Sequence, residues 1–215
     1  MKTLEVIAKF GSFTEVAREY GAETFTIDSS FYPGIDYISE IENIDISKIP
    51  FKPDILWARP NSAPFSVSTL GKHWNSDNTP KTMEAKVAIT QIKDILKLIE
   101  TLKPKFWIIE NRLGKLRKLN LINNDFLGSV TLCQYSENKN SSLPKDRPAM
   151  ARTDLWTNFY EIWTPRMMCK NGDSCHVPAK RGSSSGSQKD VGEKEKFSIP
   201  KELSHEIIKA LEHNI

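Results

Sequence analysis

Residues 54–58 read DILWA, and residues 59–67, which follow them, read RPNSAPFSV. A short apolar run bounded by polar residues and proline is typical of a strand that is buried on both faces of a sheet. Pro60 and Pro64 restrict the backbone of the segment that follows. The stretch therefore predicts a central strand that ends in a conformationally restricted loop.

Strand and helix patterns alternate on both sides of this stretch. Further strands are predicted at residues 4–8, 24–27, 105–109, 130–135 and 155–162. Helices are predicted over residues 12–20, from residue 79 onward, and from residue 199 to the end. The first helix opens on Ser12-Phe13-Thr14-Glu15, a pattern typical of a capping box. The order predicts one α/β domain over residues 1–215, with a parallel, doubly wound, Rossmann-like sheet.

The composition is that of a folded domain, and it does not identify a binding partner. The chain has 215 residues, of which 39% are apolar, so it can bury a core, and wholesale disorder is excluded. The formal net charge is +3, but residues 1–80 carry −4 and residues 81–215 carry +7. A basic half fits a polyanionic partner, and an ordinary solvated surface explains it at least as well. Residues 179–196, rich in Gly, Ser and Lys, predict a flexible loop.

The sequence shows no pattern typical of a membrane or secreted protein. No run of 18 apolar residues is present, and the first residues lack the hydrophobic stretch of a signal peptide. Three cysteines, an odd number, do not make a disulfide framework. We therefore expect a reduced, cytoplasmic protein.

Candidate site residues follow the predicted strands, because doubly wound sheets bind ligands at the carboxyl ends of their strands. Residues 10–13 join the first strand to a helix N-terminus, where backbone N–H groups can approach a cofactor. Asp28 ends the second strand and suits ribose hydroxyls, with a helix cap or a solvated acid as the alternative. Glu110 follows the strand at 105–109, a position that favours a site role over plain surface.

Several motifs, in order along the chain, resemble the DNA (cytosine-5)-methyltransferases, in particular a short branch associated with phages and viruses. That branch has Ala-Ser-Pro-Pro-Cys followed by Phe-Ser where this chain has residues 58–66, ARPNSAPFS. It has Ile-Glu-Asn-Pro where this chain has residues 109–112, IENR. Further similar segments are residues 67–74, 113–117, 133–135 and 153–158. The resemblance covers nearly the whole chain and implies the fold of S-adenosylmethionine-dependent methyltransferases.

The resemblance implies methyl transfer from S-adenosylmethionine to carbon 5 of a cytosine that is flipped out of double-stranded DNA. It implies that Glu110 holds the pyrimidine and that Arg152 stands for a later active-site arginine. The implied cofactor contacts are Phe10, Gly11, Ser12, Asp28 and Glu40. The implied substrate contacts are Arg59, Asn61, Asn111, Arg112, Lys115 and Arg117. The setting it implies is the cytoplasm of a bacterial or phage-infected host cell.

The chain departs from the family most sharply at the nucleophile, where Ser62 stands in place of cysteine. A serine hydroxyl needs an adjacent base, whereas a cysteine thiol ionises readily, and no sequence neighbour of Ser62 supplies a base. Lys9 replaces a glycine of the cofactor turn, and Arg59, Asn61 and Arg112 replace a serine and two prolines. Five departures around one predicted pocket indicate lost or altered chemistry.

Three interpretations of these departures stay open. The chain is an enzyme that still modifies cytosine, impaired by Ser62. Alternatively, it is a non-catalytic DNA-binding or regulatory relative, and an active subunit is then its partner. In the third interpretation Ser62 is a laboratory substitution in an active enzyme.

A metal site receives weaker support from the sequence. Cys169, Cys175 and His176 offer three ligands for zinc, with Cys133 as a distant fourth. Structural zinc sites usually contain closer cysteine pairs, with two to four residues between them. The sequence thus favours reduced, partly buried thiols, and no metal ligand is included in the predicted site.

Overall fold

The structure is a computed structural model that describes residues 1–140, 148–177 and 198–215. The flexible loop predicted at residues 179–196 lies outside the described residues. Among the helices that are described, none is long and apolar enough to cross a membrane.

The described residues form a seven-stranded sheet in the order β3-β2-β1-β4-β5-β7-β6. The strands are β1 (Lys2–Val6), β2 (Glu23–Asp28), β3 (Tyr37–Ile38), β4 (Ile55–Ala58), β5 (Phe106–Arg112), β6 (Leu127–Thr131) and β7 (Arg152–Thr157). The first five are parallel where they pair, while β7 runs antiparallel to both β5 and β6. The prediction of a wholly parallel sheet is therefore wrong at this edge. A strand can insert antiparallel between two others without a crossover helix.

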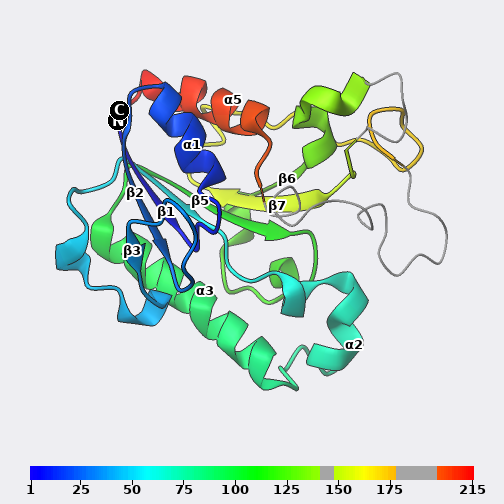
Figure 1. Cartoon of the computed structure of the whole chain (residues 1–215). Coiled ribbons are helices and arrows are strands. Elements are labelled where there is room, and N and C mark those ends of the chain that lie inside the picture. Colours follow the sequence, from blue (N-terminus) through cyan, green and yellow to red (C-terminus); the bar gives the residue numbers. More distant parts are fainter. Residues whose placement is uncertain (141–147, 178–197) are drawn as a thin grey trace.

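Helices cover both faces of the sheet, which confirms the doubly wound prediction (Figure 1). The helices are α1 (Ser12–Glu19), α2 (Leu70–His73), α3 (Met83–Leu102) and α5 (Lys201–Glu212). In Figure 1, α1 and α5 lie side by side on one face and α3 crosses the opposite face. The structure begins α3 at Met83 rather than near residue 79, because the Thr82 side chain caps it by accepting from the Ala85 N–H.

Strand β4 shows why the DILWA stretch decides the architecture. Ile55 and Trp57 belong to the hydrophobic cluster under α1 and α5, while Leu56 and Ala58 belong to the cluster under α3. All four side chains are fully buried. Successive side chains of a strand point to opposite faces, so a continuous apolar run is required where both faces are covered.

Helix α1 does not begin with the predicted capping box. Its N-cap is Gly11, with φ of 58°, and the Ser12 hydroxyl instead accepts from the backbone N–H of Ile199. The Thr14 N–H is satisfied by the carboxylate of Glu5, a fully buried residue of β1, at 2.9 Å. Burial raises the pKa of Glu5, and the backbone N–H groups of the first turn oppose that rise. A carboxylate from a strand thus replaces the local cap.

The last two strand predictions lie too far along the chain: each begins three residues after its strand does and ends beyond it. The pattern at 130–135 continues past β6 as a 3₁₀ turn, Leu132–Tyr135, and the pattern at 155–162 overruns the end of β7 at Thr157. Both overruns are apolar and buried in part, since Tyr135 and Phe159 lie in the core under α5. Burial of irregular backbone produces the same apolar pattern as a strand.

Gly114 gives a prediction about the loop after β5. A Cβ atom at this position would lie 2.2 Å from the backbone oxygen of Phe65, whereas a Cβ at Gly71 in α2 meets nothing within 4 Å. We expect Gly114→Ala to lower the free energy of unfolding by about 1–3 kcal/mol, because backbone must move. Gly71→Ala is the matched control, expected to leave stability unchanged or raise it by up to about 1 kcal/mol. Urea unfolding of both variants measures the difference, and equal stabilities would contradict the contact.

Candidate functional site

A cavity of about 860 Å³ lies at the carboxyl ends of β1, β2, β4 and β5. Eight of the residues predicted to form the site line it: Asp28, Arg59, Asn61, Ser62, Glu110, Asn111, Arg112 and Arg152. Ligands of doubly wound sheets bind at this edge because the turns that leave the strands diverge there. Residues from distant parts of the chain therefore meet in one place.

The turn after β1 forms one wall of the cavity with an unusual backbone. Ile7, Lys9 and Gly11 have φ angles of 57°, 49° and 58°, in the left-handed region. That region is favourable for glycine but costs about 1–2 kcal/mol for other residues, and a β-branched side chain is rare in it. Strained backbone of this kind is concentrated at functional sites. The sequence contained no signal for Ile7.

Asp28 fastens this turn to the end of β2. One carboxylate oxygen accepts from the Lys9 N–H at 2.9 Å, and the other accepts from the Ser30 N–H at 2.8 Å. The residue is 4% exposed and still lines the cavity. Each carboxylate oxygen can accept a second hydrogen bond, so Asp28 remains able to accept from a ligand hydroxyl.

Glu110 forms an ion pair across the cavity. The Arg59 Nε lies 2.7 Å from the Glu110 Oε2, and the two side chains are 13% and 11% exposed. Arg112 lies beside this pair; burial lowers its pKa, the Glu110 carboxylate opposes that, and Arg59 reinforces it. The cavity wall thus holds three arginines, Arg59, Arg112 and Arg152, around the carboxylate of Glu110. Such a wall is cationic overall and suits an anionic ligand.

The loop after β4 is held in place by two asparagines, Asn61 of the loop itself and Asn111 of β5. Asn111 donates from its side chain to the Pro60 carbonyl at 3.1 Å, and the Asn61 N–H donates to Gln91 of α3 at 2.8 Å. Asn61 in turn accepts from the Ala63 N–H at 3.1 Å. These contacts bracket Ser62, whose hydroxyl makes no hydrogen bond with any residue that the structure describes. None of the described residues is therefore in position to activate the Ser62 hydroxyl as a base.

Six predicted site residues lie outside the cavity lining: Phe10, Gly11, Ser12, Glu40, Lys115 and Arg117. Phe10 packs on Tyr32, a lining residue, with ring centroids 5.2 Å apart. Lys115 contacts Asn78 and lies over the Trp74 ring. Arg117 pairs with the buried Asp154, a partner that the sequence did not suggest. Their site roles remain predictions.

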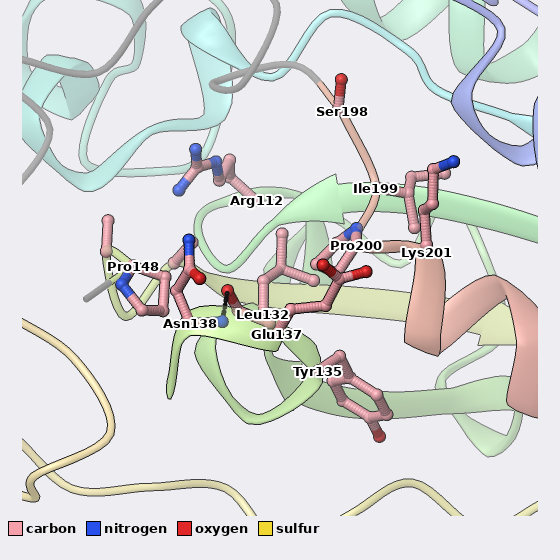
Figure 2. A pocket seen from close by; sticks show the side chains of 13 residues that line it. Arg112, Leu132, Tyr135, Glu137, Asn138, Pro148, Ser198, Ile199, Pro200 and Lys201 are labelled. Carbon is pink, nitrogen blue, oxygen red and sulfur yellow. Dashed lines mark hydrogen bonds between the residues drawn. The ribbon is translucent and has the colours of Figure 1, made fainter. Parts of the chain in front are cut away.

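A second, smaller cavity of about 240 Å³ adjoins the first and shares Arg112, Leu132 and Ser198 with it. In Figure 2, Arg112 and Ser198 lie at the upper side of the view and Tyr135 at the lower side, with Leu132 between them. The sequence did not indicate this cavity, because its walls come from the turn after β6 and the residues before α5, far apart in the chain.

The larger cavity can be tested against S-adenosylmethionine, the cofactor that the resemblance implies. Its volume falls within the range of about 300–1,000 Å³ typical of small-molecule sites. Asp28, Ser29, Ser30 and Tyr32 offer hydroxyl and carboxylate groups near the strained turn, as a ribose and an adenine require. Lys9 opposes the fit, since the cofactor carries a sulfonium cation. The residues present fit the cofactor in size and in hydrogen-bonding groups.

The cysteines and a histidine gather beyond these cavities. Cys133, although distant from the others in the sequence, lies with Cys169, Cys175 and His176 in space. The potential ligand atoms are all within 4.8 Å of one another. Cys133 directly follows Leu132, which lines both cavities. The cluster is therefore adjacent to the site but does not line it.

Comparison with known proteins is consistent with this architecture. No family model and no curated protein matches the chain. A solved structure of a proposed DNA modification methyltransferase encoded within an E. coli prophage is similar at a TM-score of 0.51 and 11% identity, over 79% of this chain and 52% of that one. A mutant of Spodoptera frugiperda DNMT2 is similar at 0.45 and 16%, over 83% and 57%. The chain spans just over half the length of each.

These similarities concern the fold. With 11% identity to the prophage-encoded protein, the comparison carries the architecture and no residue role. The chain has an α/β Rossmann-like fold, as the sequence predicts, and shares it with the prophage-encoded protein.

Proposed function

We propose that the chain is a homologue of the DNA cytosine C5-methyltransferases whose transfer of a methyl group from S-adenosylmethionine to cytosine is impaired at Ser62. The observation that carries the proposal is the meeting of Ser62, from the loop after β4, and Glu110, from β5, in one cationic cavity at the sheet edge. The motifs that resemble the family lie at these two positions. Double-stranded DNA is the proposed partner.

Five residues of the cavity have roles in this proposal. Glu110 holds the pyrimidine through its carboxylate, and Arg59 keeps that carboxylate in position by the ion pair at 2.7 Å. Arg112 and Arg152 face the anionic substrate. The cofactor, bound between the turn after β1 and the end of β2, supplies the methyl group. The Ser62 hydroxyl takes the nucleophile position, and none of the described residues is hydrogen-bonded to it as an activating base.

The Arg59–Glu110 pair also favours a second function, a non-catalytic DNA-binding relative. In that case the glutamate is neutralised by Arg59 and serves the structure of the loop after β4, while the arginines hold DNA. An active subunit would then supply the chemistry. The two functions differ in whether a restored nucleophile restores transfer.

Cofactor binding is the first test, by titration calorimetry of S-adenosylmethionine into the full chain with and without duplex DNA. We expect binding, and we expect Lys9→Gly to tighten it about three- to tenfold, because one nearby cation is removed. Lys9→Ala removes the same charge, so it should also bind the cofactor more tightly than the wild type. It keeps a Cβ atom at φ of 49°, so its free energy of unfolding should be lower than that of Lys9→Gly.

Lys72→Ala is the control for loss of a positive charge, because Lys72 lies on α2 and is 66% exposed. It should leave cofactor affinity unchanged. Absence of binding by the wild type and by Lys9→Gly would contradict cofactor use and leave the DNA-binding function. An equal gain from Lys72→Ala would mean that Lys9 acts only through net charge.

A further inference from the structure

Four potential metal ligands converge at the end of β6. Cys133 lies in the 3₁₀ turn Leu132–Tyr135, while Cys169, Cys175 and His176 come from the segment after β7. The Sγ atom of Cys133 lies 3.2 Å from that of Cys169 and 3.8 Å from that of Cys175. The His176 Nδ1 lies 3.6 Å from the Cys169 Sγ and 3.4 Å from the Cys175 Sγ.

These separations can be compared with a tetrahedral metal site. Zinc bonds of about 2.3 Å to sulfur and about 2.0–2.1 Å to nitrogen place two sulfurs about 3.8 Å apart, and sulfur and nitrogen about 3.5 Å apart. Three of the four separations lie close to those values, and the Cys133–Cys169 pair is shorter. The arrangement contains three thiol ligands and one imidazole, a common set for structural zinc.

We propose that Cys133, Cys169, Cys175 and His176 bind one structural zinc ion. All four positions are protein ligands, and a site closed in this way has no open position for a substrate or a water. The ion would join the segment after β7, which has no helix or strand over residues 158–177, to the end of β6. Because Leu132 precedes Cys133, the ion would also brace a wall shared by both cavities.

The surroundings favour a metal over free thiols. Cys133, Cys169 and His176 are buried, so their ligand atoms have little access to water and lie mainly against one another. The Gln134 side chain donates to the Cys175 sulfur at 3.3 Å, a contact typical of coordinated thiolates.

A disulfide between Cys133 and Cys169 explains less of the geometry. Their sulfurs lie 3.2 Å apart, whereas a disulfide bond is about 2.05 Å. A disulfide would also give no reason for Cys175 and His176 to direct their ligand atoms at the same point. The convergence of all four is what zinc requires.

Metal content tests the proposal on the full chain, expressed with zinc in the medium and purified without chelators. Mass spectrometry of metals should find one zinc per chain. Cys175→Ser and His176→Ala should lose most of it. His73→Ala should keep it, because His73 is equally buried but bonds to Thr82 instead.

Variants of the cluster could fail to fold, so the wild type carries a second measurement. Zinc is removed with a chelator under reducing conditions, and the apoprotein is titrated with zinc or cobalt(II). We expect the melting temperature to rise by at least about 5 °C with zinc. Cobalt(II) should give the visible absorption of a tetrahedral thiolate site. The proposal would be overturned if the purified protein held much less than one zinc per chain and the reduced apoprotein took up none. It would also be overturned by an intact mass two hydrogens lower than calculated, because that mass indicates a disulfide.

Discussion

Replacing Ser62 by cysteine is expected to raise methyl transfer to cytosine in duplex DNA by about 10²–10⁴-fold, the range attributed to a general base. The Ser62 hydroxyl has no hydrogen-bonding partner among the described residues that could take its proton. A thiol with a pKa near 8.5 is about one tenth ionised at pH 7.5 without such a partner. The substitution also keeps the size and shape of the side chain.

The measurement is incorporation of a radiolabelled methyl group from S-adenosylmethionine into duplex DNA. Ser66→Cys is the matched control, since Ser66 lines the same cavity at a position that the resemblance does not assign to the nucleophile. It should give no gain. Adding Glu110→Gln to the Ser62→Cys variant should remove the gain, because the amide cannot hold the pyrimidine in the same way.

A negative result would be informative when binding is retained. If Ser62→Cys binds cofactor and DNA yet transfers no methyl group, the impaired-enzyme function is wrong. The Arg59–Glu110 ion pair would then be read as a fixed part of a DNA-binding surface. Strong activity that matches an ordinary methyltransferase would instead favour the interpretation of Ser62 as a laboratory substitution.

Local patterns predicted the four strands β1, β2, β4 and β5 and their parallel direction, but they missed the short β3 and the direction of β7. The DILWA run and the run at 105–109 are apolar because helices cover both faces, and that burial is visible in the sequence. The antiparallel direction of β7 depends on which strands it pairs with, and those are residues far away in the chain. Burial patterns are the same for either direction, so the pattern could not decide it.

The site residues, too, could be predicted only in part. Glu110 and Ser62 were predicted because each follows an apolar run predicted as a strand, and strand ends meet at one edge of the sheet. The structure extends β5 through Glu110 to Arg112, which keeps Glu110 near that edge. Glu5 was missed because it lies inside a strand, where an acid reads as a surface position, and its partner is the start of α1. The cysteine cluster was underestimated because Cys133 and Cys169 are 36 residues apart and spacing alone cannot bring them together.

The sequence and the structure suggest different roles for Arg117. The resemblance implies contact with DNA, whereas its guanidinium donates through Nε to Asp154 at 2.9 Å, through a second nitrogen to the same carboxylate, and to Ser129 at 2.8 Å. Asp154 is fully buried and Arg117 is 30% exposed. The structure thus gives Arg117 a role in joining the segment after β5 to β6 and β7.

Arg117→Ala is expected to lower the free energy of unfolding by about 3–5 kcal/mol, because it leaves a buried carboxylate without its counterion. The double variant Arg117→Ala/Asp154→Ala should be more stable than Arg117→Ala alone, since the unpaired charge is then absent. Lys115→Ala, which removes a half-buried cation two residues away, should change stability by less than about 1 kcal/mol. Urea unfolding followed by tryptophan fluorescence measures all three.

DNA binding separates the two roles. If Lys115 contacts a phosphate, Lys115→Ala weakens binding and reduces the salt dependence by about one counterion. Arg117→Ala, measured where it is folded, should leave that salt dependence unchanged, because the guanidinium is already engaged by Asp154. A reduced salt slope for Arg117→Ala with little loss of stability would mean that the arginine leaves Asp154 to bind DNA. The ion pair would then be a resting contact rather than a permanent one.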